Sequence, residues 1–447
     1  MKGLIFKYWD RARSSFWFIP ILMTGTAMAL AFITVTLDAP LTDWLHRTWG
    51  WTFTGGAEGT SAVLGGIAGS MITIAGVVFS MTLVTLSLAS SQLGPRMLRN
   101  FMRDTTTQVV LGTFVATFLY CLLVLRTIRR ADELAFVPNL AASLGMLLAV
   151  VSMGVLIYFI HHVSVSIQAN EIVARISEEL IEGVNRLFPG DVGRRPPRTA
   201  GGPPDSEFLN AFDWEAQAIG AAGDGYLQFI DLDELLELAM DADVVLRLER
   251  LPGHYVVANQ PLIVVWPGNR VTEQLTESVR AAFTLGNQRT PHQDIECAIN
   301  QLVEIAVRSL SPGVNDPFTA IACVDHLGSA LCRLAKREMP SPYRHDMQDR
   351  LRMIAPAVTF AAIVNTAFDQ IRQYGRSSAA VTLRLLETIA VIAEFASRPE
   401  DLAALQRQAD MITRGARDGL SELEDRREVE ERYQAASKRI SERKVAD

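Results

Sequence analysis

The sequence predicts an integral membrane protein that is mainly α-helical, with four transmembrane helices followed by a cytosolic α+β region. Two observations support this prediction. The first 170 residues contain four long apolar runs, whereas most ionisable side chains lie after them, so the net charge of −7 hides a sharp division. The later part combines short alternating runs with amphipathic helical patterns, which is typical of a folded water-soluble region.

We expect four consecutive parts. They are a four-helix transmembrane domain (1–165), a helical extension with a Gly/Pro/Arg linker (166–205), a small α/β module (206–268) and a helical cytosolic domain (269–447). The expected spans are Phe16–Leu37, Ser61–Ser91, Gln108–Leu125 and Phe136–Ile160. Each is long enough to cross the hydrocarbon core of a bilayer as a helix.

The second span, Ser61–Ser91, is unusual for a membrane anchor. It is about 31 residues long, or about 46 Å as a helix, which exceeds the bilayer core of about 30 Å. Small and hydroxyl side chains recur at helical spacing along it and share one face: Gly69, Thr73, Gly76, Ser80, Ser87 and Ser91. The opposite side is expected to carry Ile72, Val78, Leu86 and Leu88. A small stripe of this kind indicates either close helix packing or the lining of a water-filled pathway.

Flanking cations predict the orientation of the spans. Lys2, Lys7, Arg11, Arg13, Arg96, Arg99 and Arg103 lie on one side, and Arg47, Arg126, Arg129 and Arg130 lie on the other. Seven cations against four place both termini in the cytoplasm, in a bacterial inner membrane. Gly94-Pro95 is expected to break the second span. The first apolar run is too long for a cleaved signal peptide, so we expect it to be retained.

The four cysteines show no metal-binding spacing and are expected to be free thiols in a reducing compartment. After the fourth span, an amphipathic helix is expected to continue to Phe188. Expected strands are Ala216–Gly220, Tyr226–Ile230, Val244–Leu248, His254–Ala258 and Leu262–Trp266, with a helix at Asp231–Met240. Beyond residue 269 only helices are expected: Thr272–Thr284, Asp294–Ser309, Pro317–Arg337, Met347–Tyr374, Ser377–Ser397 and one from Pro399 to Lys444.

Three segments carry a family resemblance: SMTLVTLSLASSQLGPRMLRNFMRD (Ser80–Asp104), GYLQFID (Gly225–Asp231) and RSLSPGVNDPFTA (Arg308–Ala320). With them the whole chain resembles a bacterial family of predicted integral membrane proteins, domain of unknown function 2254. The resemblance implies a four-span N-terminal region and a cytosolic C-terminal region. It implies no activity and no site residues.

The segment Arg308–Ala320 is the strongest motif outside the spans. Asn315 or Asp316 is placed to cap a helix whose first turn contains Pro317. One interpretation is a simple corner between two helices. The other is an anion or polar-ligand site at the helix N-terminus, formed by Arg308, Ser311, Asn315, Asp316 and Thr319.

Other polar clusters give weaker signals. His292, Asp294 and Glu296 alternate, but a helix starting at Asp294 would separate them, so no metal site is predicted. His161-His162 is consistent with either interface residues or a pH sensor. The chain shows no nucleotide-binding or catalytic signature, and its central spans lack charged residues. We therefore predict no enzyme, no catalytic residue and no cofactor.

The leading functional prediction is a homo-oligomeric inner-membrane channel or channel-like protein. The second span would line its pathway, and the cytosolic domain would regulate it. Its partners would be the lipid bilayer, further copies of the chain and a small ion or ligand, but not nucleic acid. The alternative is a membrane-anchored interaction or signalling protein whose cytosolic domain binds a partner or small ligand.

Overall fold

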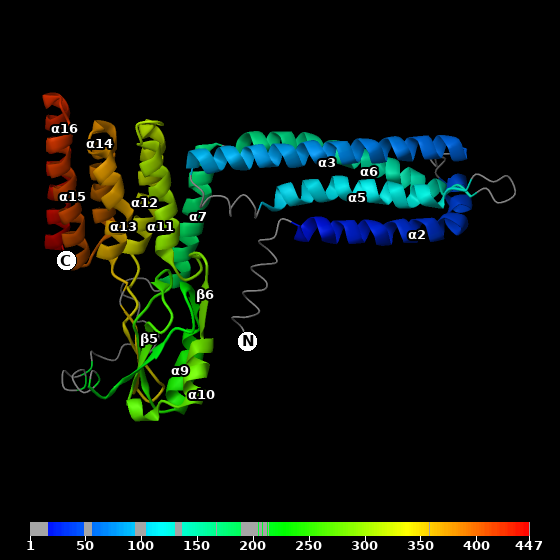
Figure 1. The fold of residues 1–447 in the computed structure, drawn as a ribbon. Helices are drawn as coiled ribbons and strands as arrows, with labels where there is room; N and C mark the ends of the chain where they lie inside the picture. The colour runs from blue at the N-terminus through cyan, green and yellow to red at the C-terminus, as the bar shows by residue number, and fades with distance from the viewer. Residues whose placement is uncertain are drawn as a thin grey trace. The chain divides into compact units, whose positions relative to one another are not determined.

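The computed structural model describes residues 17–48, 56–93, 104–129, 136–166, 168–188, 214–356 and 358–446, and also residues 204, 208 and 212. Side chains are described for these residues except 39–48, 88–93, 165–166 and 445–446. Two compact units divide the chain, Lys2–Gln168 and Ala169–Asp447 (Figure 1). Each unit has a hydrophobic core of its own.

The N-terminal unit contains four long helices. They are α2 (Phe18–Thr48), α3 (Ala57–Leu93), α5 (Thr105–Thr127) and α6 (Asn139–Ser166). All four include segments long and apolar enough to cross a membrane. Helix α5 packs against each of the other three and is the most enclosed of them. The bundle is therefore built around α5, with α3 on its outside.

The expected loop after the first span is partly helical. Helix α2 continues to Thr48 and so includes Trp44, whereas Trp49 and Trp51 lie outside the described residues. The expected break at Gly94-Pro95 and the three arginines that follow it also lie outside the described residues. Helix α6 ends at Ser166, and α7 begins at Ala169 as a separate amphipathic helix.

Seven helices form the helical subdomain of the C-terminal unit, within the described residues. They are α7 (Ala169–Leu187), α11 (Ile295–Ser309), α12 (Pro317–Ala335), α13 (Phe360–Gly375), α14 (Ala379–Phe395), α15 (Pro399–Gly419) and α16 (Leu423–Ala446). Helix α12 is a fifth segment apolar enough to cross a membrane. It packs against α7, α11, α13 and α14. Half of its apolar segment is thus buried within this subdomain.

The expectation of one C-terminal helix from Pro399 to Lys444 was wrong. The chain turns between Gly419 and Leu423, and α16 then packs against α14 and α15. A β-carbon on Gly419 would collide with the backbone oxygen of Arg376, so only glycine fits this close approach. Val429, Ala436 and Ile440 are buried and give the highly charged α16 a narrow apolar seam.

The strand subdomain contains two sheets. Its strands are β1 (Gln217–Gly220), β2 (Gly225–Ile230), β3 (Val245–Leu248), β4 (Tyr255–Val256), β5 (Pro261–Trp266), β6 (Phe283–Gly286), β7 (Tyr343–His345) and β8 (Leu351–Ile354). The orders are β1-β5-β3-β8-β7 and β4-β2-β6, and the β3–β8 pair is parallel. Helices α9 (Leu232–Asp241) and α10 (Glu273–Ala281) complete it, with a 3₁₀ turn at Gly268–Arg270. The Asp231 carboxylate caps α9.

The expectation of helices alone after residue 269 was wrong at three strands. Strand β6 replaces the end of the expected helix Thr272–Thr284, because it pairs with β2, which lies far away in the sequence. Strand β8 replaces the start of the expected helix Met347–Tyr374. Pro356 disfavours helix at the residue before it, and α13 begins only at Phe360, capped by Thr359.

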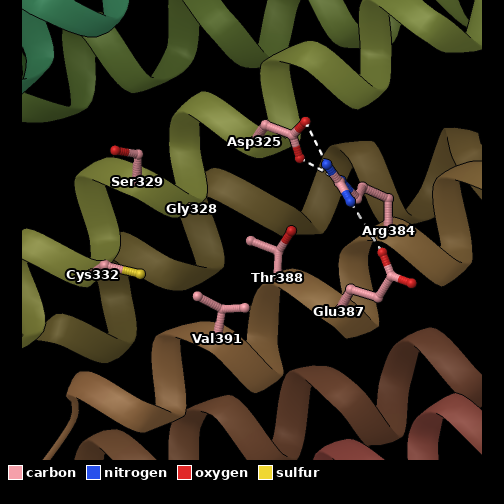
Figure 2. A pocket seen from close by; sticks show the side chains of 8 residues that line it. All are labelled: Asp325, Gly328, Ser329, Cys332, Arg384, Glu387, Thr388 and Val391. Atoms are coloured by element: carbon pink, nitrogen blue, oxygen red, sulfur yellow. Dashed lines mark hydrogen bonds and ion pairs between the residues drawn. The ribbon is translucent and has the colours of Figure 1, made fainter.

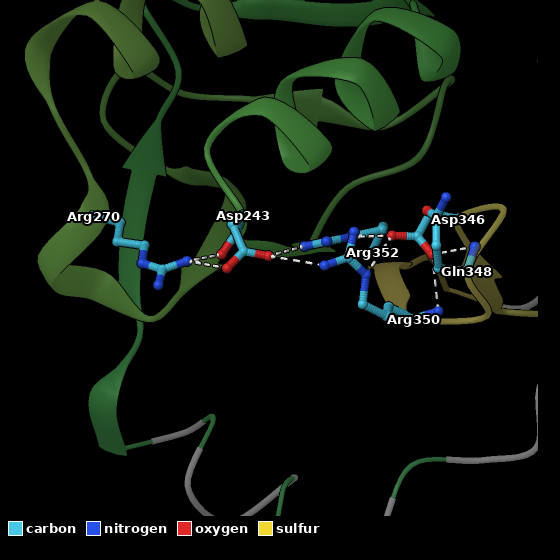
Figure 3. A network of polar contacts seen from close by, with 6 residues as sticks. All are labelled: Asp243, Arg270, Asp346, Gln348, Arg350 and Arg352. Atoms are coloured by element: carbon cyan, nitrogen blue, oxygen red, sulfur yellow. Dashed lines mark hydrogen bonds and ion pairs between the residues drawn. The ribbon is translucent and has the colours of Figure 1, made fainter.

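A charged network fixes the β7–β8 hairpin to the rest of the strand subdomain (Figure 3). Arg352 is 3% exposed and joins two carboxylates, Asp346 Oδ2 at 2.9 Å from its Nε and Asp243 Oδ1 at 2.9 Å from its Nη1. Arg270 Nη1 lies 2.7 Å from Asp243 Oδ2. Asp346 also accepts the N–H groups of Gln348 and Arg350. The hairpin is thereby held by ion pairs as well as by its strand ladder.

Candidate functional site: the outer face of α3

Helix α3 packs against the bundle through a continuous apolar stripe. Leu64, Ala68, Met71, Ala75 and Val78 are all buried, at steps of three or four residues. They meet α5 and its neighbours in the two cores of the N-terminal unit. Val78 thus lies on the packed side as expected, whereas Ile72 is 46% exposed and lies outside it.

The predicted small-residue face points away from the bundle. Gly69, Thr73, Gly76, Ser80 and Ser87 are all exposed. A β-carbon on Gly65, Gly66, Gly69 or Gly76 would have no neighbour within 4 Å. These glycines therefore make no close contact with the other helices that the structure describes. Ser91 lies in α3, but its side chain is outside the described residues.

Hydroxyl groups on this face bond to their own helix. Thr73 Oγ1 donates to the Gly69 carbonyl at 2.8 Å, and Ser70 Oγ donates to the Gly66 carbonyl at 2.8 Å. Each hydroxyl proton is then engaged, while the oxygen lone pairs remain available as acceptors. From Gly66 to Ser80 the face presents glycine surface and hydroxyl oxygens. At a rise of about 1.5 Å per residue, this stretch covers about two-thirds of the hydrocarbon core of a bilayer.

Polar contacts hold α5 among its neighbours, and the sequence analysis did not identify them. Tyr120 is fully buried; its hydroxyl lies 3.0 Å from Thr34 Oγ1 and donates to the Ala141 carbonyl at 3.0 Å. Thr117 and Ser152 lie 3.2 Å apart between α5 and α6. Hydroxyl residues inside apolar runs were the available signal, because buried hydroxyls need partners.

One carboxylate lies at each end of the bundle. Asp38, 3% exposed near the end of the first apolar segment, accepts the Leu140 N–H at 2.6 Å and so caps the start of α6. Asp104 caps α5 through Thr106 and Thr107 and pairs with His162 near the end of α6. His162 thus contacts the start of α5 within the bundle, a position compatible with both interpretations of the sequence.

The corner Arg308–Ala320 has the geometry of helix capping. Asp316 Oδ1 accepts the N–H groups of Phe318 and Thr319 at 3.1 and 3.2 Å, and Oδ2 accepts the Thr319 hydroxyl at 2.5 Å. The carboxylate occupies the place that an anion would take at this helix start. Ser311 donates to the Arg308 carbonyl, and Asn315 adopts a φ of 49° in the turn. This arrangement favours the simple corner over the anion site.

The alternating His292, Asp294 and Glu296 do not converge on one point. Asp294 caps α11 and pairs with Arg289 at 2.6 Å, while the His292 ring packs on Phe229. No group of three potential metal-binding side chains occurs among the residues that the structure describes.

A groove of about 400 Å³ lies between α12 and α14 (Figure 2). Arg384 crosses its rim and binds Asp325 with two hydrogen bonds, at 2.5 and 2.9 Å. Arg384 also reaches Glu387 at 3.1 Å, and these carboxylates raise the pKa of its guanidinium. Gly328, Cys332 and Thr388 line the interior, where the cysteine is a free thiol. The sequence analysis did not identify this groove, because it forms only where two helices meet.

Comparison with known proteins adds a family and no activity. A family model described as "Predicted membrane protein (DUF2254)" matches residues 13–391. Uncharacterised proteins of Mycobacterium bovis and of two Mycobacterium tuberculosis strains are each 34% identical over 370 residues, covering 80% of this chain and 68% of the relative. No solved structure matches. The chain therefore belongs to the DUF2254 family of predicted membrane proteins, as its three motifs predicted.

Proposed function

We propose that this membrane protein is a homo-oligomeric channel of the bacterial inner membrane. Copies of α3 would pack together near Gly66 and Gly69 of their outward faces and line the pathway further along, at Thr73, Ser80 and Ser87. The observation that carries the proposal is this face: it is small, continuous and turned away from the packed bundle of its own chain. The role is non-enzymatic, and the C-terminal unit would regulate it.

Four spans fit the packing better than five. Helix α12 contains Asp325 and Arg333, and Asp325 is paired with Arg384 of α14. Its neighbours are amphipathic helices with charged outer faces, so its burial is that of a water-soluble bundle. In the N-terminal unit, Asp38 joins the end of the first apolar segment to the start of α6, and Asp104 joins the start of α5 to the end of α6. This alternation supports an even number of crossings, which puts both ends of the bundle on one side of the membrane, and the flanking cations favour the cytoplasm as that side.

Oligomerisation follows from the physics of helix association in lipid. Lipid tails are as apolar as leucine side chains, so close backbone approach at small residues drives helix pairing in bilayers. The first part of the outward face of α3 offers that approach at Gly66 and Gly69, which contact no other helix among the described residues. A second copy is therefore the partner with the matching face, while Thr73, Ser80 and Ser87 further along line the pathway.

The chemistry of the face also favours one class of permeant. Because the Thr73 and Ser70 protons bond to helix carbonyls, the oxygens of these two hydroxyls face outward as acceptors. Acceptor oxygens bind water and cations in place of a hydration shell, and a pathway can be lined by them without buried charge. We therefore propose water-filled conduction of a small cation.

Thiol accessibility and conductance test the proposal. We would place single cysteines at Thr73, Ser80 and Ser87 after replacing Cys121, and treat the protein in liposomes with a small water-soluble thiol reagent. Val150 of α6, 70% exposed on the lipid side of the bundle, provides the control position. Labelling at the three α3 positions and protection at residue 150 are the expected result. Conductance in planar bilayers should fall in Ser80→Leu.

Uniform protection of the three positions, with no conductance, would reject the channel. The groove between α12 and α14 supports the second candidate, a membrane-anchored protein whose C-terminal unit binds a small ligand. Its volume of about 400 Å³ falls within the range of small-molecule sites. Ligand-dependent thermal stabilisation that is lost in Val391→Trp, which fills the groove from an exposed lining position, would favour this candidate.

A further inference from the structure

An exposed apolar patch lies at one end of the helical subdomain. Val314 is 52% exposed, Phe318 is 81% exposed and Tyr374 is 58% exposed. We call these three residues the apical patch. Phe318 is the second residue of α12, after Pro317 and the capping residue Asp316. Val314 lies in the preceding turn. A helix start needs neither side chain to be apolar, so capping leaves their chemistry unexplained.

The three patch residues lie at or next to two turns, one between α11 and α12 and one between α13 and α14. A β-carbon on Gly375 would lie 3.5 Å from Leu310 Cδ1, so the end of α13 adjoins the end of α11. Tyr374 precedes that glycine, and Val314 follows Leu310 by four residues. The α11–α12 and α13–α14 turns therefore share one end of the bundle.

Helix α7 begins at this same end. Its far end is fixed by Asn185, which accepts from Arg337 at 3.0 Å, and by Arg186, which donates to the His292 carbonyl at 3.1 Å. Arg337 follows the end of α12, so α7 and α12 run in the same direction. Each has 19 residues, or about 28 Å of helix, and their first residues are thus nearly level.

The chain enters this end directly from a membrane-crossing helix. Helix α6 ends at Ser166, and only two residues separate it from Ala169, the first residue of α7. Two residues reach no more than about 10 Å to the next α-carbon, even when fully extended. The start of α7 therefore stays close to the membrane boundary, and the apical patch lies at the same end of its own subdomain.

The chemistry of the patch fits that boundary. Phe318 and Val314 are apolar, Tyr374 is amphipathic, and Arg376 is exposed two residues beyond Tyr374. Asp316, the carboxylate nearest to Phe318 in the sequence, is engaged by three hydrogen bonds at the start of α12. Apolar and aromatic side chains with flanking arginine are typical of segments at the headgroup level of a bilayer.

We propose that the apical patch is a lipid-binding surface, which inserts Phe318 and Val314 among the headgroups of the bilayer that holds the spans. Tyr374 and Arg376 lie at the headgroup level and keep their polar ends in water. This contact makes the membrane itself a ligand of the C-terminal unit. It is independent of whether α3 lines a channel.

Site-directed fluorescence in the full chain tests the proposal. Cys297 and Cys332, both half-buried, would be replaced by serine, while the fully buried Cys121 and Cys323 stay. Phe318→Cys would carry an environment-sensitive dye in phosphatidylcholine nanodiscs that hold one chain each. Met347→Cys, 95% exposed in the β7–β8 turn, is the matched control. Lipids brominated near the start of the acyl chains provide the quencher.

We expect the position 318 dye to be quenched about twofold more than the position 347 dye, because interfacial side chains lie within about 5–10 Å of the acyl boundary. Adding Val314→Asp and Tyr374→Asp should abolish the difference without loss of thermal stability, because both side chains are exposed. Equal quenching at positions 318 and 347 would overturn the proposal. So would protection of position 318 that appears only when two chains share a nanodisc, since a second copy would then cover the patch.

Discussion

Asp104 Oδ2 lies 3.0 Å from His162 Nε2 and links the first turn of α5 to the last turns of α6. The same carboxylate caps α5, so the Asp104 side chain both caps one helix and pairs with a residue of another. The His162 ring also stacks on Tyr158, with ring centroids 6.0 Å apart. The end of the bundle from which the chain leaves toward α7 is therefore held by one polar cluster.

Substitutions at Asp104 should separate its capping of α5 from its pairing with His162. Asp104→Ala removes the cap and should lower the free energy of unfolding by about 1 kcal/mol or more. Asp104→Asn keeps a capping oxygen and loses the charge, so its loss should be smaller. His162→Phe keeps the stacked ring and tests the pair alone. Unfolding by sodium dodecyl sulfate in mixed micelles measures all three, and equal stability of Ala and Asn variants would contradict the capping role.

Asp38 should be important for the opposite end of the bundle. Its Oδ1 accepts the Leu140 N–H at 2.6 Å in a site that is 3% exposed, where water is scarce. Asp38→Ala leaves that N–H without its cap and should cost about 1–2 kcal/mol. Asp38→Asn retains an acceptor and should cost less. If Asp38→Ala unfolds at the same detergent fraction as the parent, the cap at α6 is unimportant.

The network around Arg352 predicts acid sensitivity of the strand subdomain. Burial by itself would raise the pKa of Asp346, but hydrogen bonds from Arg350, Arg352 and Gln348 lower it below the usual range. Hydrogen bonds from Arg270 and Arg352 likewise lower the pKa of Asp243. A carboxyl with a lowered folded-state pKa stabilises the fold above its unfolded value of about 3.9 and loses that effect as the pH falls.

Arg352→Gln should therefore move the acid unfolding transition to higher pH, because Asp346 loses a cation that favours its charged form. Circular dichroism during acid titration measures the midpoint. Arg427→Gln removes an arginine from a solvent-exposed pair with Glu424 on α16 and provides the control. A midpoint that is the same in the Arg352 and Arg427 variants would show that the hairpin does not depend on the network.

Gly328 of α12 should tolerate no side chain, although it lies within a helix. A β-carbon there would collide with the Thr388 methyl group of α14, whose χ1 rotation is restricted. Gly328→Ala should cost about 1–3 kcal/mol by overpacking, although alanine is the better helix former. Thr388→Ser removes the methyl group and should restore most of the loss in the double variant.

Gly183→Ala in α7 is the matched control, because a β-carbon at residue 183 meets nothing within 4 Å. Helix propensity should make that variant slightly more stable than the parent, by about 1 kcal/mol or less. Thermal unfolding followed by circular dichroism measures the set. A Gly328→Ala variant as stable as Gly183→Ala would mean that α12 and α14 can separate at no cost.

Local patterns in the sequence predicted the elements that depend on local chemistry. The apolar runs located α2, α3, α5 and α6, and the stripe on α3 was correctly assigned to one helix face. Five strands, β1 to β5, were placed within one or two residues, because alternation and Pro or Gly turns bound them. Asp316 was one of the two residues expected to cap α12, and the helix expected from Asp231 begins one residue later, at Leu232.

Features that depend on distant residues were missed. Strand β6 forms because it pairs with β2, and strand β8 forms because it pairs with β3. Each partner lies far away in the sequence, so a short stretch of sequence does not reveal the pairing. The central place of α5 follows from Tyr120 and its partners Thr34 and Ala141, which belong to three helices. Pro356 and Gly419 were readable signals of helix ends, but the prediction did not use them.

The parallel β3–β8 pair also constrains how the protein is made. Strand β8 is placed between β3 and β7 in the sheet, but it follows β3 by about a hundred residues of chain, including the whole of α11 and α12. During synthesis the ribosome must therefore release α11 and α12 while one edge of β3 still has no neighbour. Exposed strand edges are prone to pairing with the wrong chain. Nascent chains stopped before residue 351 should thus need chaperone protection that chains stopped after β8 do not.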